Sequence, residues 1–233
     1  MPRLTPQLID EAVERSNPLY EREIILRGLK FSIIENLGIG LDAYDSYDMC
    51  DNDITKFDGF PMLKKAAYFY CNNNRISFIA GDLHIKLPHL KEVSLINNDI
   101  RSFTDIKRLE KCKGLKVLSL TRNPVTVQDN YRAFVIYTLP SLRFLDFNRI
   151  REKERVDAKK FFEETEVGMD LLRTVVAQVK EEKDTIDSFG RGLKYNFLSE
   201  THDSHPKKAE AKKWRKLIFS REGVIHANFW SLF

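Results

Sequence analysis

The 233-residue sequence has few cysteines and no long apolar run. Its three cysteines lack the paired spacing of a secreted disulfide framework, so we expect a reducing compartment. Residues 1–6 do not form the apolar core of a signal peptide, and nowhere do about 18 apolar residues run together, as a membrane span requires. We therefore expect a soluble protein without a membrane partner.

The sequence also lacks the motifs of common catalytic and metal sites. It has no Gly-rich phosphate loop, no Cys-x-x-Cys pair and no His-Glu-x-x-His pair. His202 and His205 have no third ligand nearby, so a polar loop is the better interpretation. The string Asp51-Asn52-Asp53 resembles the start of a calcium loop but lacks its Gly and closing Glu. We expect no enzyme activity, no metal and no cofactor.

Charge is low overall but uneven along the chain. A net charge of +4 does not by itself indicate a nucleic-acid-binding protein. Residues 207–221 hold seven basic side chains against one acid, with Trp214 and Phe219 among the apolar residues between them. This segment fits an amphipathic helix for RNA, an acidic partner or a membrane surface, and a solvated or packed terminal helix fits about as well. The candidate contacts with an RNA backbone in this segment are Lys212, Lys213, Arg215 and Lys216. Lys64 and Lys65, in an earlier linking segment, are further candidates. Lysines in such a segment more often form a solvated face.

What the sequence does contain is a repeat. Residues 47–54, 69–76, 93–100 and 118–125 share the order apolar, any, apolar, any, any, Asn, any, apolar. Their asparagines are 22, 24 and 25 residues apart, as in leucine-rich repeats. A degenerate first copy has Leu29 at the Asn position, which makes five repeats. The repeat asparagines are Asn52, Asn74, Asn98 and Asn123.

The repeat predicts a solenoid. Two apolar residues two positions apart point from a short strand into the core. The Asn then turns the chain, and its amide satisfies backbone groups that the bend leaves unpaired, so stacked asparagines form a buried ladder. We predict an α/β fold: a right-handed leucine-rich-repeat solenoid with a concave parallel sheet, a helical N-terminal cap, a C-terminal cap and a helical C-terminal extension.

Both ends of such a sheet need a cover. Thr5 and Pro6 predict the start of a helix, whose apolar stripe is Leu8, Ile9, Ala12 and Val13. Residues 131–140 predict a buried helix and residues 141–147 a final strand-like turn. The expected organisation is a capped repeat domain at 1–150, a helical extension at 151–182 and a basic, partly flexible tail at 183–233, loop-like before its basic segment.

The candidate binding surface is the concave face, the side of the strands that points away from the core. Acidic side chains outnumber basic ones on this face, so it should bind phosphate groups poorly. Tyr68 and Tyr70 lie near its middle, and Tyr is enriched in interface hot spots, although strand propensity alone also explains them. Five strands span roughly 20 Å, enough for one helix of a partner. The predicted contacts are Glu23, Ile25, Arg27, Ser46, Asp48, Tyr68, Tyr70, Asn72, Glu92, Ser94, Ile96 and Ser119.

Several strings resemble one family. Ile-Ile-Glu-Asn-Leu-Gly at 33–38, Asp-Gly-Phe-Pro at 58–61, Arg-Asn-Pro-Val-Thr at 122–126 and Leu-Asp-Phe at 145–147 are similar to the U2 A-prime family of capped leucine-rich-repeat proteins. The resemblance implies a nuclear, non-catalytic scaffold of the spliceosomal U2 snRNP in pre-mRNA splicing. It implies that the concave face binds a helix of an RRM protein, the B-double-prime subunit, and supports its binding to a U2 snRNA stem-loop, alongside other spliceosomal proteins. Arg27 is then a candidate polar anchor.

Two other functions stay open. The same repeats occur in regulatory scaffolds for other nuclear or signalling proteins such as a phosphatase, and the partner recovered from a nuclear extract distinguishes these. The third hypothesis is direct RNA binding through residues 207–221 without a protein partner, which predicts a steep salt dependence.

Overall fold

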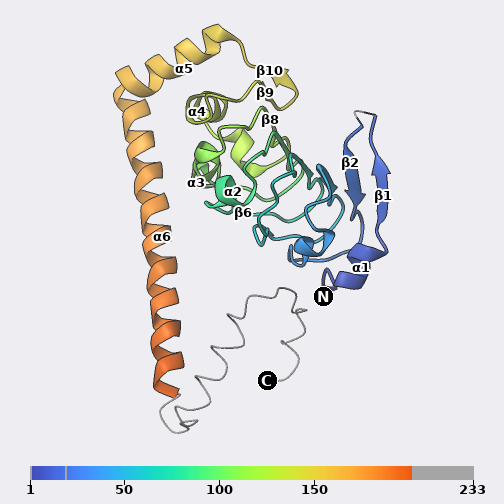
Figure 1. Cartoon of the computed structure of the whole chain (residues 1–233). Coiled ribbons are helices and arrows are strands. Elements are labelled where there is room, and N and C mark those ends of the chain that lie inside the picture. The colour runs from blue at the N-terminus through green and yellow to red at the C-terminus, as the bar shows by residue number, and fades with distance from the viewer. Residues whose placement is uncertain (1, 19, 201–233) are drawn as a thin grey trace, which may run out of the picture. The chain divides into compact units, whose positions relative to one another are not determined.

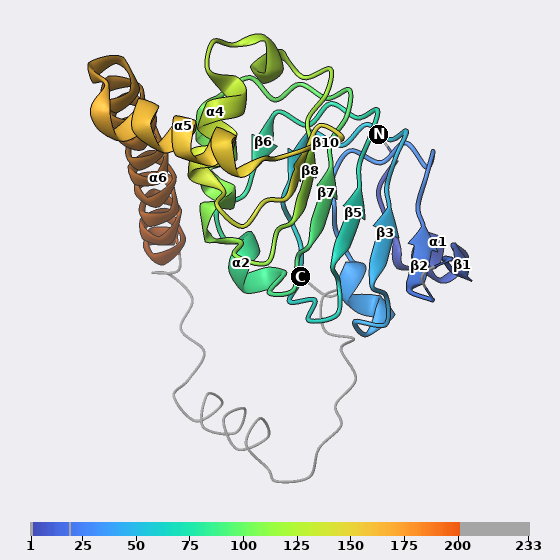
Figure 2. The same cartoon turned by 90° about the horizontal axis from the view of Figure 1, so that it is seen from above.

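The chain forms a row of short parallel strands, as the repeat predicts (Figure 1). This computed structural model describes residues 2–18 and 20–200, without the side chains of 183 and 185–200. One eight-stranded sheet has the order β1-β2-β3-β5-β7-β8-β9-β10, and Figure 2 shows β3, β5, β7 and β8 side by side. The five parallel repeat strands are β2 (Arg22–Ile25), β3 (Ser46–Asp48), β5 (Tyr68–Tyr70), β7 (Glu92–Ser94) and β8 (Val117–Ser119).

The core is a column of equivalent side chains from successive repeats. The strand register pairs Tyr47 with Phe69, Phe69 with Val93, and Val93 with Leu118. Each of these four side chains is at most 1% exposed. The rings of Tyr47 and Phe69 stack with their centroids 5.1 Å apart. Burying one such side chain contributes about 1.5–3 kcal/mol, so the column holds neighbouring repeats together.

The repeat asparagines form a ladder between adjacent repeats. The Asn74 amide Nδ2 donates to the carbonyls of Met49 and Cys71, each at 3.0 Å. Its Oδ1 accepts from the Ile54 N–H at 3.0 Å. Each asparagine therefore satisfies backbone groups of its own repeat and of the preceding one. Asn52, Asn98 and Asn123 likewise donate to a carbonyl of the preceding repeat and accept one of its N–H groups.

The residue before the ladder position has a left-handed backbone in every repeat. The φ angles are 75° at Gly28, 61° at Asp51, 57° at Asn73, 55° at Asn97 and 60° at Arg122. Gly, Asn and Asp adopt this region at low cost, so four of the five positions hold suitable residues and Arg122 does not. The amides of Asn73 and Asn97 also form an exposed row, since Asn73 donates to Asp51 at 2.7 Å and Asn97 donates to Asn73 at 3.0 Å.

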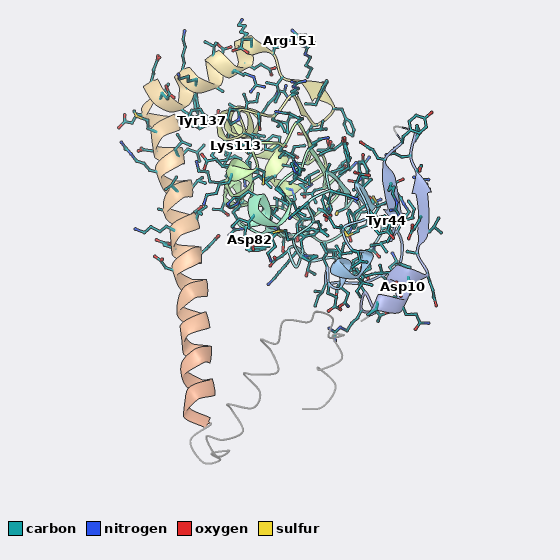
Figure 3. All side chains as sticks on the ribbon, viewed as in Figure 1. Asp10, Tyr44, Asp82, Lys113, Tyr137 and Arg151 are labelled. Atoms are coloured by element: carbon teal, nitrogen blue, oxygen red, sulfur yellow. The ribbon has the colours of Figure 1, made fainter. Side chains whose placement is uncertain are left out.

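The linking segments lie on the other side of the core from the sheet. They contain a second, two-stranded parallel sheet of β4 (Lys56–Phe57) and β6 (Phe78–Ile79) and the helices α2 (Leu83–Lys86) and α3 (Phe103–Arg108). Three 3-10 turns complete them: η1 (Leu37–Gly40), η2 (Leu109–Lys111) and η3 (Pro124–Val127). Figure 3 shows side chains filling the space between the sheet and these segments. Gly59, with φ of 84°, makes one close approach, because a Cβ there would lie 2.1 Å from the Ile34 carbonyl oxygen.

The N-terminal cover differs from the predicted helix. Thr5 caps α1 (Pro6–Asp10) as expected, because its side chain accepts from the Leu8 N–H at 3.3 Å. The helix ends at Asp10, so the predicted helical stripe is wrong at Ala12 and at Val13. Val13 is 64% exposed and lies in β1 (Val13–Ser16), which pairs antiparallel with β2. A β-hairpin therefore covers the first edge of the repeat sheet.

The C-terminal cover follows the prediction more closely. α4 (Tyr131–Thr138) is the buried helix, β9 (Phe144–Leu145) adds a parallel strand to β8, and β10 (Asn148–Arg149) turns back against β9. α5 (Glu152–Glu164) packs on α4, where the Phe162 ring lies 5.9 Å from Phe134 and 5.0 Å from Tyr137 between centroids. α5 thus covers the end of the core.

The last helix is longer than predicted. α6 (Glu166–Glu200) continues past residue 182, so the loop expected there is wrong for 183–200. The described residues up to 181 form one compact unit, and those from 182 onward belong to a second. The basic segment 207–221 lies outside the described residues.

Candidate protein-binding face

The predicted contact residues lie in rows across the repeat sheet. Their neighbours along each strand are the buried core residues, so these side chains point to the opposite, concave face. Five of them are well covered and at most 7% exposed: Glu23, Ser46, Asp48, Ser94 and Ser119. One row is Glu23, Ser46, Tyr68, Glu92 and Val117, and the next is Ile25, Asp48, Tyr70, Ser94 and Ser119. Arg27, Asn72 and Ile96 follow two positions after the second row.

Tyr68 and Tyr70 lie in the middle strand and are half-buried. A hydrogen bond with the Glu21 carboxylate, together with burial, raises the pKa of Tyr68 to about 12. Burial and the nearby Glu92, Glu21 and Glu23 raise the pKa of Tyr70 to about 12. Both hydroxyls therefore stay protonated at neutral pH. The proton of the Tyr68 hydroxyl is donated to Glu21, whereas the Tyr70 hydroxyl can donate to a partner.

Glu92 differs from the other acid in its row, Glu23. Among the described residues its side chain has no hydrogen bond and no ion pair, and burial followed by the charge of Glu21 raises its pKa. Glu23 is 5% exposed, but its carboxylate pairs with Arg15 at 2.6 Å and accepts from the Ser46 hydroxyl at 3.3 Å. The charge of Glu23 is therefore compensated, and that of Glu92 is not.

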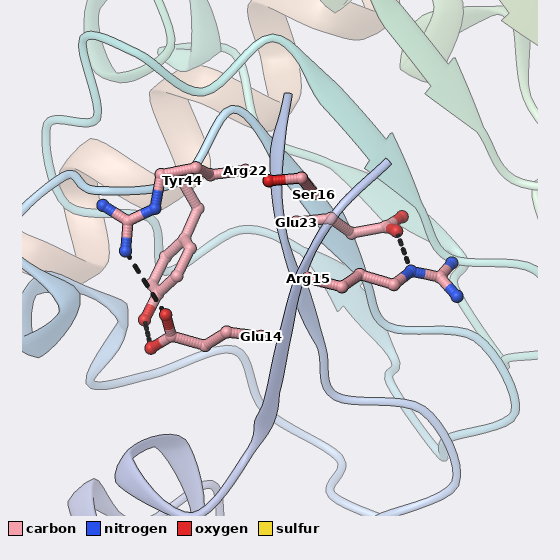
Figure 4. A pocket seen from close by; sticks show the side chains of 6 residues that line it. All are labelled: Glu14, Arg15, Ser16, Arg22, Glu23 and Tyr44. Carbon is pink, nitrogen blue, oxygen red and sulfur yellow. Dashed lines mark hydrogen bonds and ion pairs between the residues drawn. The ribbon is translucent and has the colours of Figure 1, made fainter. Parts of the chain in front are cut away.

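The β1–β2 hairpin contributes Arg15 and Glu21, which strand alternation within the repeats missed. Figure 4 shows the pair of Arg15 with Glu23, and also Glu14, which accepts from the Tyr44 hydroxyl and pairs with Arg22 at 3.3 Å. The available signal was Asn17-Pro18, a dipeptide typical of turns.

The same hairpin lines a small open pocket. Its volume is about 240 Å³, below the ~300–1,000 Å³ typical of small-molecule sites. No group of three or more His, Cys, Asp or Glu residues in the described part of the chain is placed to hold a metal. Nor does any helix of that part have the length and apolarity needed to cross a membrane. We take the concave face as the candidate site because the strand register brings the predicted contact residues together there.

The structure describes two groups of the predicted basic contacts. The Arg27 guanidinium, the candidate polar anchor, bonds Asp48 at 3.0 Å and Asp51 at 2.7 Å, so its charge is balanced within the protein. Lys64 and Lys65 are exposed in the segment before β5, where their backbone N–H groups bind the Asp42 carboxylate. Lys212, Lys213, Arg215 and Lys216 lie outside the described residues.

Comparison with known proteins gives consistent results. A family model described as leucine-rich repeat matches residues 1–176. The probable U2 small nuclear ribonucleoprotein A' of Caenorhabditis elegans is 46% identical over 162 residues, and the human U2 small nuclear ribonucleoprotein A' is 44% identical over 162 residues. Each match covers 70% of this chain and 64% of the relative, so the chain spans less than two thirds of their length.

Two further matches cover more of the relative. The Schizosaccharomyces pombe U2 small nuclear ribonucleoprotein A' is 36% identical over 75% of this chain and 73% of its own length. The crystal structure of the Drosophila melanogaster SNF/U2A' complex contains a chain that is 40% identical, with a TM-score of 0.72 over 75% of this chain and 99% of that chain. The chain therefore belongs to the U2 small nuclear ribonucleoprotein A' family of leucine-rich-repeat proteins.

Proposed function

We propose that the chain is a non-catalytic scaffold of the U2 snRNP that acts in the nucleus during pre-mRNA splicing. In this role its concave face binds an RRM protein, the B-double-prime subunit, and supports the binding of that protein to a U2 snRNA stem-loop. The observation that carries the proposal is the likeness, at 40% identity and a TM-score of 0.72, to a chain of the SNF/U2A' complex.

The geometry of the concave face supports a helix as the guest. Five parallel strands at about 4.8 Å spacing give a surface roughly 20 Å wide, and a helix with its side chains is about 10–12 Å across. Tyr68 and Tyr70 stand on β5, the middle one of these strands. Tyrosine supplies a large contact area with a polar tip, and it is enriched among the residues that dominate binding energy.

The charges of the face favour a protein over RNA as its direct ligand. Glu21, Glu23 and Glu92 surround the two tyrosines, and a phosphate backbone would be repelled there. We therefore assign U2 snRNA mainly to the partner protein, with other spliceosomal proteins as further contacts and no membrane.

Calorimetry with the purified RRM protein of the U2 snRNP tests the proposal. The double variant Tyr68→Ala/Tyr70→Ala should weaken binding about tenfold or more, as expected for two central interface residues. The matched control is Ile85→Ala on α2, a residue 56% exposed on the other side of the core, which should bind like the wild type. Wild-type affinity in a folded double variant would exclude the concave face. Recovery of a phosphatase from a nuclear extract, in place of the RRM protein, would favour the regulatory scaffold.

A further inference from the structure

We propose that Tyr68, Tyr70 and Glu92 form a receptor for one arginine side chain on the partner's helix. This inference rests on the proposed function and names the chemistry of the contact at the centre of the concave face. The three residues, called here the arginine receptor, lie on adjacent strands, because Tyr68 on β5 pairs directly with Glu92 on β7.

The first step is the uncompensated charge. The Glu92 side chain has no hydrogen bond or ion pair among the described residues, although it is partly buried. A carboxylate removed from water without a partner costs free energy, and an incoming cation recovers that cost. The pKa of the Glu92 carboxyl is raised by burial and by Glu21, which agrees with an ion that lacks a partner.

The second step is the sign of the surroundings. Glu21 from the hairpin and Glu23 from β2 also lie near Tyr70. Together with Glu92, their charges raise the pKa of the Tyr70 hydroxyl. Arg15 compensates Glu23 at 2.6 Å, and the Lys91 ammonium lies 5.6 Å from the Tyr68 ring centroid. Glu21 and Glu92 are then the two carboxylates near the tyrosines that have no basic partner among the described residues. The face thus attracts a cation and repels an acidic guest.

The third step selects arginine among cations. A guanidinium is planar, so it stacks on an aromatic ring while its N–H groups bond a carboxylate in a bidentate pair. Tyr68 and Glu92 provide such a ring and such a carboxylate on neighbouring strands. The Tyr70 hydroxyl, which has no hydrogen bond among the described residues, lies in the next row as a further polar contact. Lysine is a compact and strongly hydrated charge, so it cannot stack flat on the ring and form a bidentate pair with the carboxylate at the same time.

The test uses the full chain and the RRM protein of the U2 snRNP in calorimetry. Glu92→Gln should weaken binding about tenfold or more, because the partner's arginine loses a desolvated ion pair. It should not lower the midpoint of thermal unfolding, because it removes an uncompensated charge. Glu164→Gln, an exposed carboxyl at the end of α5, makes the same change in net charge and should leave binding unchanged.

A pH series gives a second readout. Wild-type affinity should fall as the pH falls through the raised pKa of Glu92, since protonation removes the attraction. Glu21, Glu23, Tyr68, Tyr70 and Lys91 also face this centre, so the difference between wild type and Glu92→Gln is the quantity to compare. Equal pH profiles in the two proteins would contradict the inference.

The results separate the inference from the proposed function. Substituting each arginine on the partner's helices by Gln should reveal one whose effect vanishes in the Glu92→Gln background, the signature of a coupled pair. If no arginine couples to Glu92, or a lysine does instead, the arginine receptor is wrong, while loss of binding in Tyr68→Ala/Tyr70→Ala still supports the concave face. If neither the tyrosine nor the Glu92 variants alter binding, the proposed function falls as well.

Discussion

At the scale of single residues, the ladder asparagines hold the bend after each strand. Asn74 is 9% exposed and bonds the Met49 and Cys71 carbonyls and the Ile54 N–H. Asn74→Ala leaves these buried groups unpaired, at about 1–3 kcal/mol for each one that water does not reach. We expect a loss of roughly 3 kcal/mol in the free energy of unfolding, measured by urea denaturation.

Asn73 is the matched control for this prediction. It is the same residue type one position earlier, but it is exposed and its amide donates to Asp51 on the surface. Asn73→Ala should therefore cost less than Asn74→Ala, about 1–2 kcal/mol, through two lost surface hydrogen bonds and the left-handed backbone. Equal losses at the two positions would show that the ladder bonds do not stabilise the bend.

The left-handed position before the ladder suggests a stabilising change. Arg122 has φ of 60° where the preceding repeats have Asn, Asn and Asp. Arg122→Asn should raise the free energy of unfolding by about 0.5–1 kcal/mol, because Asn adopts this region at lower cost and its amide can extend the exposed row to Asn97. Arg122→Ala is the control, because Ala neither favours the left-handed backbone nor extends the row of amides. A similar increase of its free energy of unfolding in urea denaturation would refute the explanation.

At the scale of elements, the repeats were predictable and the two departures have different causes. Repeat strands share one template, so a parallel register places Tyr68 beside Glu92 from the sequence alone. The hairpin has no counterpart in the template, and the apolar Val13 fits a helical stripe as well as an alternating strand. Arg15 and Glu21 were missed with it. Without that antiparallel pairing, the carboxylate of Glu23 would have seemed as uncompensated as that of Glu92.

The C-terminal departure came from local composition. Phe189-Gly190-Arg191-Gly192 contains two glycines, which disfavour a helix and agree with the expected loop. Ile186, Phe189 and Leu193 nevertheless recur at spacings of three and four, which is a helical period. The helix continues through the glycines to Glu200, so periodicity was the better guide than composition in α6.

The packing of α5 on α4 gives a prediction for an element. Phe162 is 1% exposed and its ring contacts Phe134 and Tyr137. Phe162→Ala should cost about 3–5 kcal/mol, because it opens a cavity where α5 covers the core. Val156→Ala, on the same helix but 45% exposed, should change stability by less than about 1 kcal/mol. Denaturant unfolding of the two variants compares them, and similar midpoints would mean that α5 does not cap the core.

At the scale of the whole repeat unit, short elements make the fold cooperative. Its repeat strands have three or four residues each, too few to stand alone, yet one continuous core cluster runs from Leu4 to Val175. In a solenoid, stability is a sum of weak repeat terms and strong interfaces between neighbours. We therefore expect residues 2–181 to unfold as one unit, although each repeat contacts only its neighbours.

Hydrogen exchange of Ile9→Ala tests this expectation. Ile9 lies in α1, is 3% exposed and belongs to the core cluster, so its truncation should cost about 2–5 kcal/mol. If the unit is cooperative, the most protected amides of β7 and β8 lose the same free energy of protection as those of β2, although they lie several repeats away. Faster exchange confined to β1, β2 and β3 would instead show that the repeats unfold stepwise from the N-terminal cover. The hairpin that carries Glu21 to the tyrosines would then open independently of the strands beneath it, and the concave face would lose part of its charge before the sheet unfolds.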